Sequence, residues 1–212
     1  MNDILNNYDI YIFDLDNTLY DERQYLFHVY QKIAKSINRV YDIEWQAVYN
    51  DLMKYFEKFG RKELFDSIIE KHNIPKNEIK NMLKILRTCN FSGKIPLFPE
   101  MFIFLKYLIK NNKKIYIVTN GNVIQQKNKV ENIDWQGFYK FINVIFAKQY
   151  KEKPFTDTFF EIRKTVFGEL KSFVMIGDKE SDQKYANNCG IDFYNINNVR
   201  ERIKANWMYY KK

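Results

Sequence analysis

Two aspartates, Asp14 and Asp16, follow directly after the apolar run of residues 10–13. A short apolar run of this kind fits a buried parallel strand, so both carboxylates are expected at the opening where that strand ends. A carboxylate is a known covalent nucleophile toward phosphoryl groups. The second carboxylate, two residues on, can handle the proton of the leaving group. The pair is therefore suited to phosphoryl transfer.

Two more carboxylates, Asp178 and Asp182, follow the apolar run of residues 173–176. They matter because an attacking carboxylate anion is repelled by a phosphate dianion unless that repulsion is neutralised. A hard cation does this, and Mg²⁺ binds a few carboxylates together with phosphate oxygens and water. We therefore predict a Mg²⁺ site to which Asp178 and Asp182 supply the remaining ligands.

The phosphate itself needs donors, and two segments offer them. The hydroxyl of Thr119 and the amino group of Lys153 can hold phosphate oxygens. The backbone N–H groups of Asn120 and Gly121 can add further hydrogen bonds. We predict catalytic roles for Thr119 and Lys153, and substrate binding by Asn120 and Gly121.

Each segment alone also has an ordinary structural explanation. An Asp-x-Asp sequence after a strand is often a turn or a helix cap, and Thr-Asn-Gly is a common turn. Lys-Pro occurs widely on surfaces, and Gly-Asp often begins a loop. Short motifs match by accident, but all four segments follow predicted strands or lie in loops at the same edge. Agreement between several levels of description favours the functional interpretation.

The elements that must position these residues alternate after Pro99. Expected helices cover residues 101–109, 123–130, 156–166 and 182–189, and expected strands cover residues 114–118, 144–146, 173–176 and 191–194. Thr156 is the expected N-cap of its helix, and Gly190 is the expected end of the last one. This alternation predicts an α/β fold with a Rossmann-like parallel sheet, in which ligands bind beyond the carboxyl ends of the strands.

A different pattern separates the first strand from the others. Between residues 21 and 88 apolar residues recur at helical spacing in four consecutive stretches, with no strand among them. This pattern predicts an inserted α-helical domain of four helices. We therefore expect a core made of residues 1–19 and 95–212 and a helical cap domain made of residues 20–94.

With these features the chain resembles the haloacid dehalogenase-like hydrolase superfamily. The stretch from Phe13 to Tyr20 resembles the first motif of the superfamily, and the other three motifs are matched by residues 118–121, 153–154 and 176–182. The resemblance covers essentially the whole chain, and the helical insertion resembles the superfamily's cap.

The resemblance also implies roles for individual residues. It implies that Asp14 is the nucleophile that forms an aspartyl-phosphate, and that Asp16 is first the general acid and then the general base. It implies Mg²⁺ held by Asp14, the backbone carbonyl of Asp16 and Asp178, with Asp182 in support. Dehalogenases of the superfamily lack the second carboxylate, because a halide leaves without a proton. The presence of Asp16 therefore favours hydrolysis of a phosphate ester.

The expected substrate is a small phosphorylated metabolite, such as a sugar or polyol phosphate or a nucleoside monophosphate. Tyr20, at the entry to the helical insertion, and Arg61, in an interhelical turn, are predicted to contact it. A solvated loop is the alternative for Arg61. Two other functions stay open. One is a phosphomutase on the same core, and the other is a non-catalytic interaction module that keeps the fold.

Composition limits the remaining classes of protein. The formal net charge of the 212 residues is +8, but the lysines are spread along the chain among acidic residues, so we expect no nucleic-acid partner. No apolar run approaches a membrane span, so we expect no membrane association. The first seven residues do not resemble a signal peptide, and two isolated cysteines suit a reducing cytoplasm. A monomer or homodimer is expected.

Overall fold

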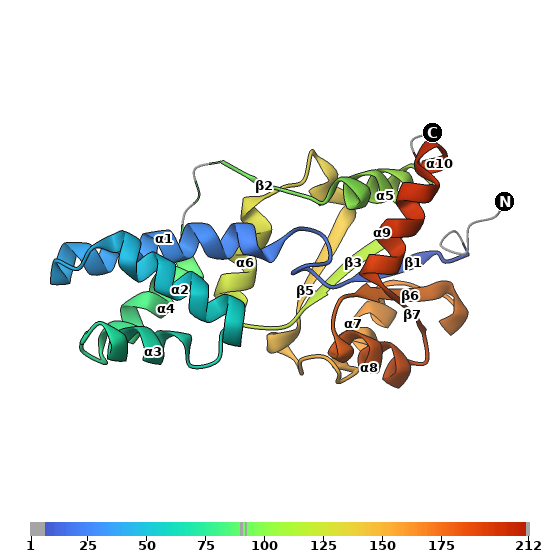
Figure 1. Cartoon of the computed structure of the whole chain (residues 1–212). Coiled ribbons are helices and arrows are strands. Elements are labelled where there is room, and N and C mark those ends of the chain that lie inside the picture. Colours follow the sequence, from blue (N-terminus) through green and yellow to red (C-terminus); the bar gives the residue numbers. More distant parts are fainter. Residues whose placement is uncertain (1–6, 90, 92, 211–212) are drawn as a thin grey trace. The chain divides into compact units, whose positions relative to one another are not determined.

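The computed structural model describes residues 7–89, 91 and 93–210 (Figure 1), so most of the N-terminal stretch considered as a leader lies outside the described residues. The chain divides into two compact units. The core unit contains the segment that ends at Asp21, the segment Ile95–Gln126 and the segment that begins at Ile133. The helical unit contains Glu22–Lys94 and also Lys127–Asn132, a stretch that the sequence analysis assigns to the core.

The core unit is built on a five-stranded parallel sheet in the order β5-β3-β1-β6-β7. The strands are β1 (Ile10–Phe13), β3 (Lys114–Thr119), β5 (Ile142–Phe146), β6 (Phe173–Gly177) and β7 (Asp192–Asn195). Strand β1 is central, and Phe13 is in register with Ile117 of β3 and Ile176 of β6. The predicted α/β parallel core is confirmed, and β1, β3 and β6 end at the same edge.

Helices cover both faces of this sheet (Figure 1), which explains why β1 is apolar throughout. Ile10 and Ile12 belong to a buried cluster that includes side chains of α7 (Asp157–Thr165) and α8 (Glu180–Cys189). Tyr11 and Phe13 point to the opposite face. There they pack edge-to-face against Phe104 of α5 (Pro99–Lys110), with ring centroids 5.8 and 6.3 Å away. Helix α9 (Ile196–Ala205) packs against α5.

Some elements of the core unit differ from expectation. A short two-stranded sheet of β2 (Ile95–Pro96) and β4 (Ile133–Asp134), and the C-terminal helices α9 and α10 (Trp207–Tyr210), were not predicted. β2, β4 and α10 have only two or four residues and are too short to show a period. Helix α9 has ten residues, and its buried side chains Ile196, Val199 and Ile203 do recur at helical spacing, so that pattern was overlooked. Gly190 ends α8 in the left-handed conformation, as predicted. Thr156 does precede α7, but its side chain makes no capping hydrogen bond. Helix α6 (Val123–Asn132) follows β3.

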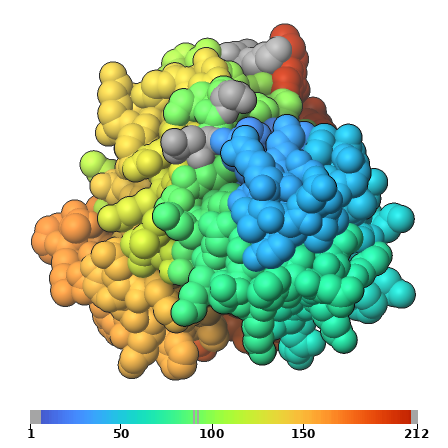
Figure 2. Space-filling model, turned by 90° about the vertical axis from the view of Figure 1, so that its left-hand side faces the viewer, coloured from blue at the N-terminus to red at the C-terminus, as the bar shows by residue number. Residues whose placement is uncertain are grey.

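The helical unit contains the four predicted helices, α1 (Glu22–Tyr41), α2 (Trp45–Phe59), α3 (Leu64–Lys71) and α4 (Glu78–Thr88). In α1 and α3 the buried side chains recur at three- and four-residue spacing, which gives each of these two helices one apolar face. In the space-filling view the blue atoms of α1 lie on the surface of this unit (Figure 2). Within the described residues, we find no helix with the length and apolar character that a membrane crossing needs.

Candidate active site

The segment after β1 turns back on itself and buries both aspartates. Asp14 continues the strand pairing, since its N–H donates to the carbonyl of Ile176 at 2.9 Å. Asn17 then takes φ +58°, a left-handed conformation that asparagine tolerates better than most residues. The turn leaves Asp14 3% exposed and Asp16 4% exposed. Two adjacent buried carboxylates need partners, and the following contacts supply them.

Lys153 brings the first and last motifs together. Its Nζ lies 2.6 Å from Oδ1 of Asp14 and 2.7 Å from Oδ1 of Asp182, and its side chain is 1% exposed. Asn120 fixes the lysine backbone from both sides: its Nδ2 donates to the Lys153 carbonyl at 2.9 Å, and its Oδ1 accepts from the Lys153 N–H at 2.9 Å. Asn120, predicted to bind substrate, therefore also positions the lysine.

The carboxylates of Asp14, Asp178 and Asp182 form an acidic cluster. Ligand atoms of Asp14, Asp178 and Asp182 all lie within 4.8 Å of one another. Burial raises the pKa of Asp178 to about 6, and the like charges of Asp14 and Asp182 add to this rise, while Lys179 opposes it. Burial and the Asp14 charge likewise raise the pKa of Asp182, against the effect of Lys153. Crowded carboxylates of this kind favour a bound cation.

The donor set fits a hard divalent cation. Asp14 Oδ2 and Asp178 Oδ1 are buried and accept no hydrogen bond from the described residues. The Nζ of Lys179 lies 3.6 Å from Asp14 Oδ2 and 3.9 Å from Asp178 Oδ1. Buried carboxylate oxygens without donors are costly unless something else coordinates them. Oxygen ligands of this charge and number are those that Mg²⁺ takes.

Asp182 also holds the loop that carries Asp178. Its Oδ2 accepts from the Lys179 backbone N–H at 3.1 Å, which caps the N-terminus of α8. The approach requires glycine at position 177, because a Cβ there would lie 2.3 Å from Asp182 Oδ2. The close approach of the Asp182 carboxylate thus explains why a glycine precedes Asp178.

Two of the predicted phosphate donors, Thr119 and Gly121, form hydrogen bonds to other groups of the protein. Thr119 is 1% exposed, and among the described residues its hydroxyl makes only a long hydrogen bond of 3.4 Å, to the carbonyl of Asn120. The Gly121 N–H, predicted to bind phosphate, donates instead to Oε1 of Glu152 at 2.7 Å. A carboxylate thus occupies the donor that was assigned to the substrate. Glu152 was not singled out from the sequence, where it is one of several charged residues around Lys153.

Tyr20 and Gln126 both contact Asp16. The Tyr20 hydroxyl donates to Asp16 Oδ1 at 2.6 Å, and Gln126 Nε2 donates to Asp16 Oδ2 at 3.2 Å. Tyr20, predicted as a substrate contact, is fully buried. Gln126 was not predicted from the sequence. Its position on the first turns of the helix that follows Gly121 was the available signal, because that turn lies at the carboxyl edge of the sheet.

In the helical unit, the predicted substrate residue Arg61 pairs with a buried acid. It donates to both carboxylate oxygens of Glu22, at 2.9 and 3.3 Å. Glu22 also receives Lys129 Nζ at 2.6 Å, and that lysine is fully buried. The Arg61 side chain keeps 43% of its surface exposed. A structural role for Arg61 is therefore present, and its substrate role stays a prediction.

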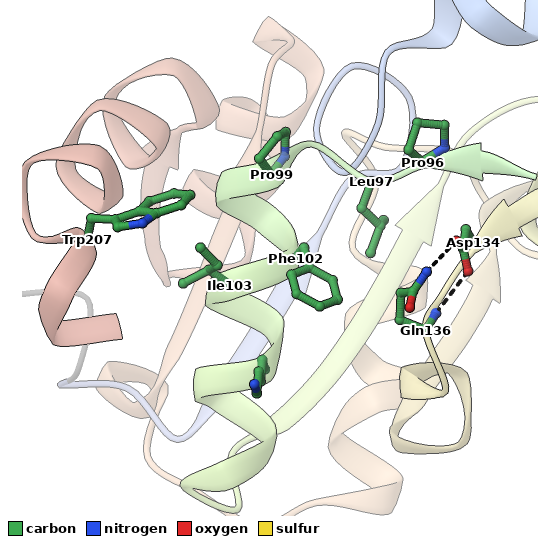
Figure 3. A pocket seen from close by; sticks show the side chains of 9 residues that line it. Pro96, Leu97, Pro99, Phe102, Ile103, Asp134, Gln136 and Trp207 are labelled. Atoms are coloured by element: carbon green, nitrogen blue, oxygen red, sulfur yellow. Dashed lines mark hydrogen bonds between the residues drawn. The ribbon is translucent and has the colours of Figure 1, made fainter. Parts of the chain in front are cut away.

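A mostly apolar hollow of about 560 Å³ lies elsewhere in the core unit (Figure 3). Figure 3 shows Trp207 at one end and Asp134, hydrogen-bonded to Gln136, at the other. The described residues that line it are Pro96, Leu97, Pro99, Phe102, Ile103, Lys106, Asp134, Gln136 and Trp207. None of them belongs to the predicted site, so the chemistry is expected at the acidic cluster.

Solved structures share the fold. A HAD hydrolase, YfnB from Bacillus subtilis, described as bound to magnesium, aligns with a TM-score of 0.64 and 18% identity over 88% of this chain and 86% of that one. A predicted phosphoglycolate phosphatase from Haemophilus somnus aligns with a TM-score of 0.61 and 18% identity over 90% and 88%. At these identities the likeness shows the fold alone.

Comparison of the sequence with family models identifies the family. No curated protein matches the chain significantly. The family model described as haloacid dehalogenase-like hydrolase, in contrast, matches residues 11–196, from within β1 to the start of α9. This range contains every residue of the acidic cluster and the whole helical unit. The chain therefore belongs to the haloacid dehalogenase-like hydrolase family.

Proposed function

We propose that the chain is a Mg²⁺-dependent phosphatase that hydrolyses a phosphate monoester of a small metabolite through an aspartyl-phosphate. The observation that carries the proposal is the position of Asp14. Its carboxylate ends the central strand, is buried, and lies beside Lys153, Asp178 and Asp182. This environment combines a nucleophile with the positive charge and oxygen ligands that phosphoryl transfer needs.

The first step forms the covalent bond. An oxygen of Asp14 attacks phosphorus, and the bond between phosphorus and the ester oxygen breaks. The leaving oxygen keeps that electron pair and takes the proton of Asp16, which becomes a carboxylate. Lys153, 2.6 Å from Asp14, holds the nucleophile in place and offsets the negative charge around it. The product alcohol leaves, and the phosphoryl group stays on Asp14.

The second step releases phosphate. The Asp16 carboxylate takes a proton from a water molecule as the water oxygen bonds to phosphorus. The bond to Asp14 then breaks, its electrons return to the carboxylate, and inorganic phosphate leaves. Asp14, the Asp16 carbonyl and Asp178 would hold Mg²⁺, with Asp182 in support. When bound, the ion neutralises charge between the nucleophile and the phosphate.

As substrate we propose a sugar or polyol phosphate or a nucleoside monophosphate, with Arg61 as a contact. Tyr20, first predicted as a second contact, is buried against Asp16. We propose no nucleic-acid or membrane partner. Among similar structures, one from Lactobacillus delbrueckii is described as a phosphoglycolate phosphatase; it aligns with a TM-score of 0.55 and 20% identity over 89% of this chain and 86% of that one. That description supports phosphate-ester hydrolysis, and it leaves the substrate of this chain open.

The test is release of inorganic phosphate from a panel of phosphorylated metabolites in the presence of Mg²⁺. We expect turnover of at least one sugar, polyol or nucleoside monophosphate. Isomerisation of a sugar phosphate without phosphate release would favour a phosphomutase instead. If no compound reacts and the protein binds a partner equally well with Asp14→Asn, the interaction module would replace the enzyme.

A further inference from the structure

Asp16 is held at both of its carboxylate oxygens. The Tyr20 hydroxyl donates to Oδ1 at 2.6 Å, and Gln126 Nε2 donates to Oδ2 at 3.2 Å. The three side chains are 4%, 0% and 5% exposed, so water has little access to these bonds. A carboxyl group fixed at both ends has one orientation, whereas one held at a single oxygen can still rotate.

Gln126 is itself fixed. Its Nε2 also donates to the carbonyl of Asn120 at 2.7 Å, so the amide is shared between two acceptors. The helix that carries Gln126, α6, is capped at its N-terminus by Asn122, whose side chain accepts hydrogen bonds from the N–H groups of Ile124 and Gln125. Space for the amide depends on Gly121, because a Cβ there would lie 3.1 Å from Gln126 Nε2.

Tyr20 is fixed by the turn that follows β1. The left-handed Asn17 reverses the chain, and Asp16 and Tyr20 form an isolated bridge between their backbones. The next anchor is a hydrogen bond of 2.9 Å from the Phe98 N–H to the Leu19 carbonyl. The tyrosine ring is therefore buried, and its hydroxyl points back to the aspartate four residues earlier.

We propose that Tyr20 and Gln126 are positioning residues that hold the Asp16 carboxyl group where it can transfer a proton to the leaving oxygen. This inference rests on the proposed phosphatase reaction. Proton transfer in a positioned pair is sensitive to small displacements, and a misplacement of about 1 Å costs on the order of a hundredfold. For Tyr20, this positioning role, exerted through Asp16, replaces the substrate contact first predicted.

The test uses two substrates of nearly equal size that differ in their leaving group. Phenyl phosphate expels a poor leaving group and depends on proton donation, while p-nitrophenyl phosphate expels a stable phenolate and depends on it little. In Tyr20→Phe and Gln126→Met we expect kcat/KM on phenyl phosphate to fall about tenfold or more. We expect kcat/KM on p-nitrophenyl phosphate to stay within about threefold. This ratio reports the steps up to departure of the phenol and excludes hydrolysis of the aspartyl-phosphate, which both substrates share.

Matched controls separate positioning from general damage. Tyr116→Phe removes another largely buried hydroxyl, which pairs with Thr165 at 2.8 Å, and Gln125→Met changes the neighbouring glutamine. Each control should lower the rates of hydrolysis of the two substrates equally or leave both unchanged. Near-ultraviolet circular dichroism checks folding. Either test variant decides the question alone, so one that fails to fold leaves the decision to the other.

The outcomes are distinguishable. Equal losses of kcat/KM on both substrates in a folded Tyr20→Phe or Gln126→Met variant would overturn the positioning role and leave the phosphatase intact. A selective loss on phenyl phosphate would support it. Failure of the unmodified protein to hydrolyse either substrate with Mg²⁺ present would count against the phosphatase reaction itself, and the inference would fall with it.

Discussion

Lys153 Nζ lies 2.6 Å from Oδ1 of Asp14, although 139 residues separate them in the chain. The same amino group lies 2.7 Å from Oδ1 of Asp182, so one lysine joins segments from both ends of the chain. A buried lysine with two carboxylate partners is held rigidly, since each charge would be costly alone. The proposed reaction depends on this arrangement.

Asp14→Asn should abolish turnover while the fold is kept, because the side chain keeps its size and loses its nucleophilic oxygen. We expect phosphate release to fall by about a thousandfold or more. Phosphate release and circular dichroism are measured together, with Asp66→Asn on the exposed surface of α3 as the control. Activity of Asp14→Asn within tenfold of the unmodified protein would rule out this nucleophile.

Removal of divalent cations should stop the reaction, and Mg²⁺ should restore it. Asp178→Asn should weaken Mg²⁺ binding by about tenfold or more, because it removes one charge from the cluster of three carboxylates. Titration calorimetry with Mg²⁺ gives the affinity independently of activity. Full turnover in excess chelator would contradict the metal site, as would an unchanged affinity in the Asp178 variant.

Gly177→Ala should disturb the acidic cluster through sterics alone. The new Cβ would lie 2.3 Å from Asp182 Oδ2, so the carboxylate that caps α8 has to move. We expect a loss of about 1–3 kcal/mol in the free energy of unfolding and weaker Mg²⁺ binding. Gly168→Ala is the control, because its Cβ would lie no nearer than 3.2 Å to a side-chain atom, the Cδ1 of Ile10, with Phe173 and Ser172 at 3.5 and 3.7 Å. Equal behaviour of the two variants would argue against the proposed crowding.

In the helical unit, Lys129→Met should be strongly destabilising. The lysine is fully buried and pairs with Glu22 at 2.6 Å, and its Nζ lies 5.2 Å from the centre of the Tyr25 ring. Loss of one partner of a buried pair costs about 3–5 kcal/mol, and the Arg61 contact that Glu22 retains reduces this to about 2–3 kcal/mol. Urea unfolding gives the value. Lys127→Met, on the exposed side of α6, should change it little.

The contribution of Glu100 to stability should depend on pH. Burial raises the pKa of this carboxyl, but its backbone hydrogen bond and the charges of Lys204 and Arg200 outweigh burial and lower it below the usual range. The ionised form is thus favoured in the folded state. The stabilisation is fully present above pH 4.5 and is lost as the pH falls through the lowered pKa. Glu100→Gln should cost about 1–2 kcal/mol at pH 7 and less at pH 4. A cost in urea unfolding that does not change with pH would contradict the linkage.

Much of the fold could be predicted from the sequence, because it depends on local patterns. The apolar run before Asp14, the strand–helix alternation after Pro99 and the helical spacing of residues 21–88 are each visible within a few residues. The order of the four motifs along the chain also identified the family. Prediction from local patterns also has a cost. The β2–β4 pair was missed because strands of two residues show no measurable period.

Only the tertiary structure decided which groups form hydrogen bonds with one another. The sequence named Asp16, Gly121 and Arg61, but the bonds of these residues to Gln126, Glu152 and Glu22 join segments that are 110, 31 and 39 residues apart. Hydrogen bonds act over about 3 Å, so they depend on where the sheet and helices carry each residue. Residue type and order along the chain determine what chemistry is available. The packing of distant segments determines which of these groups meet.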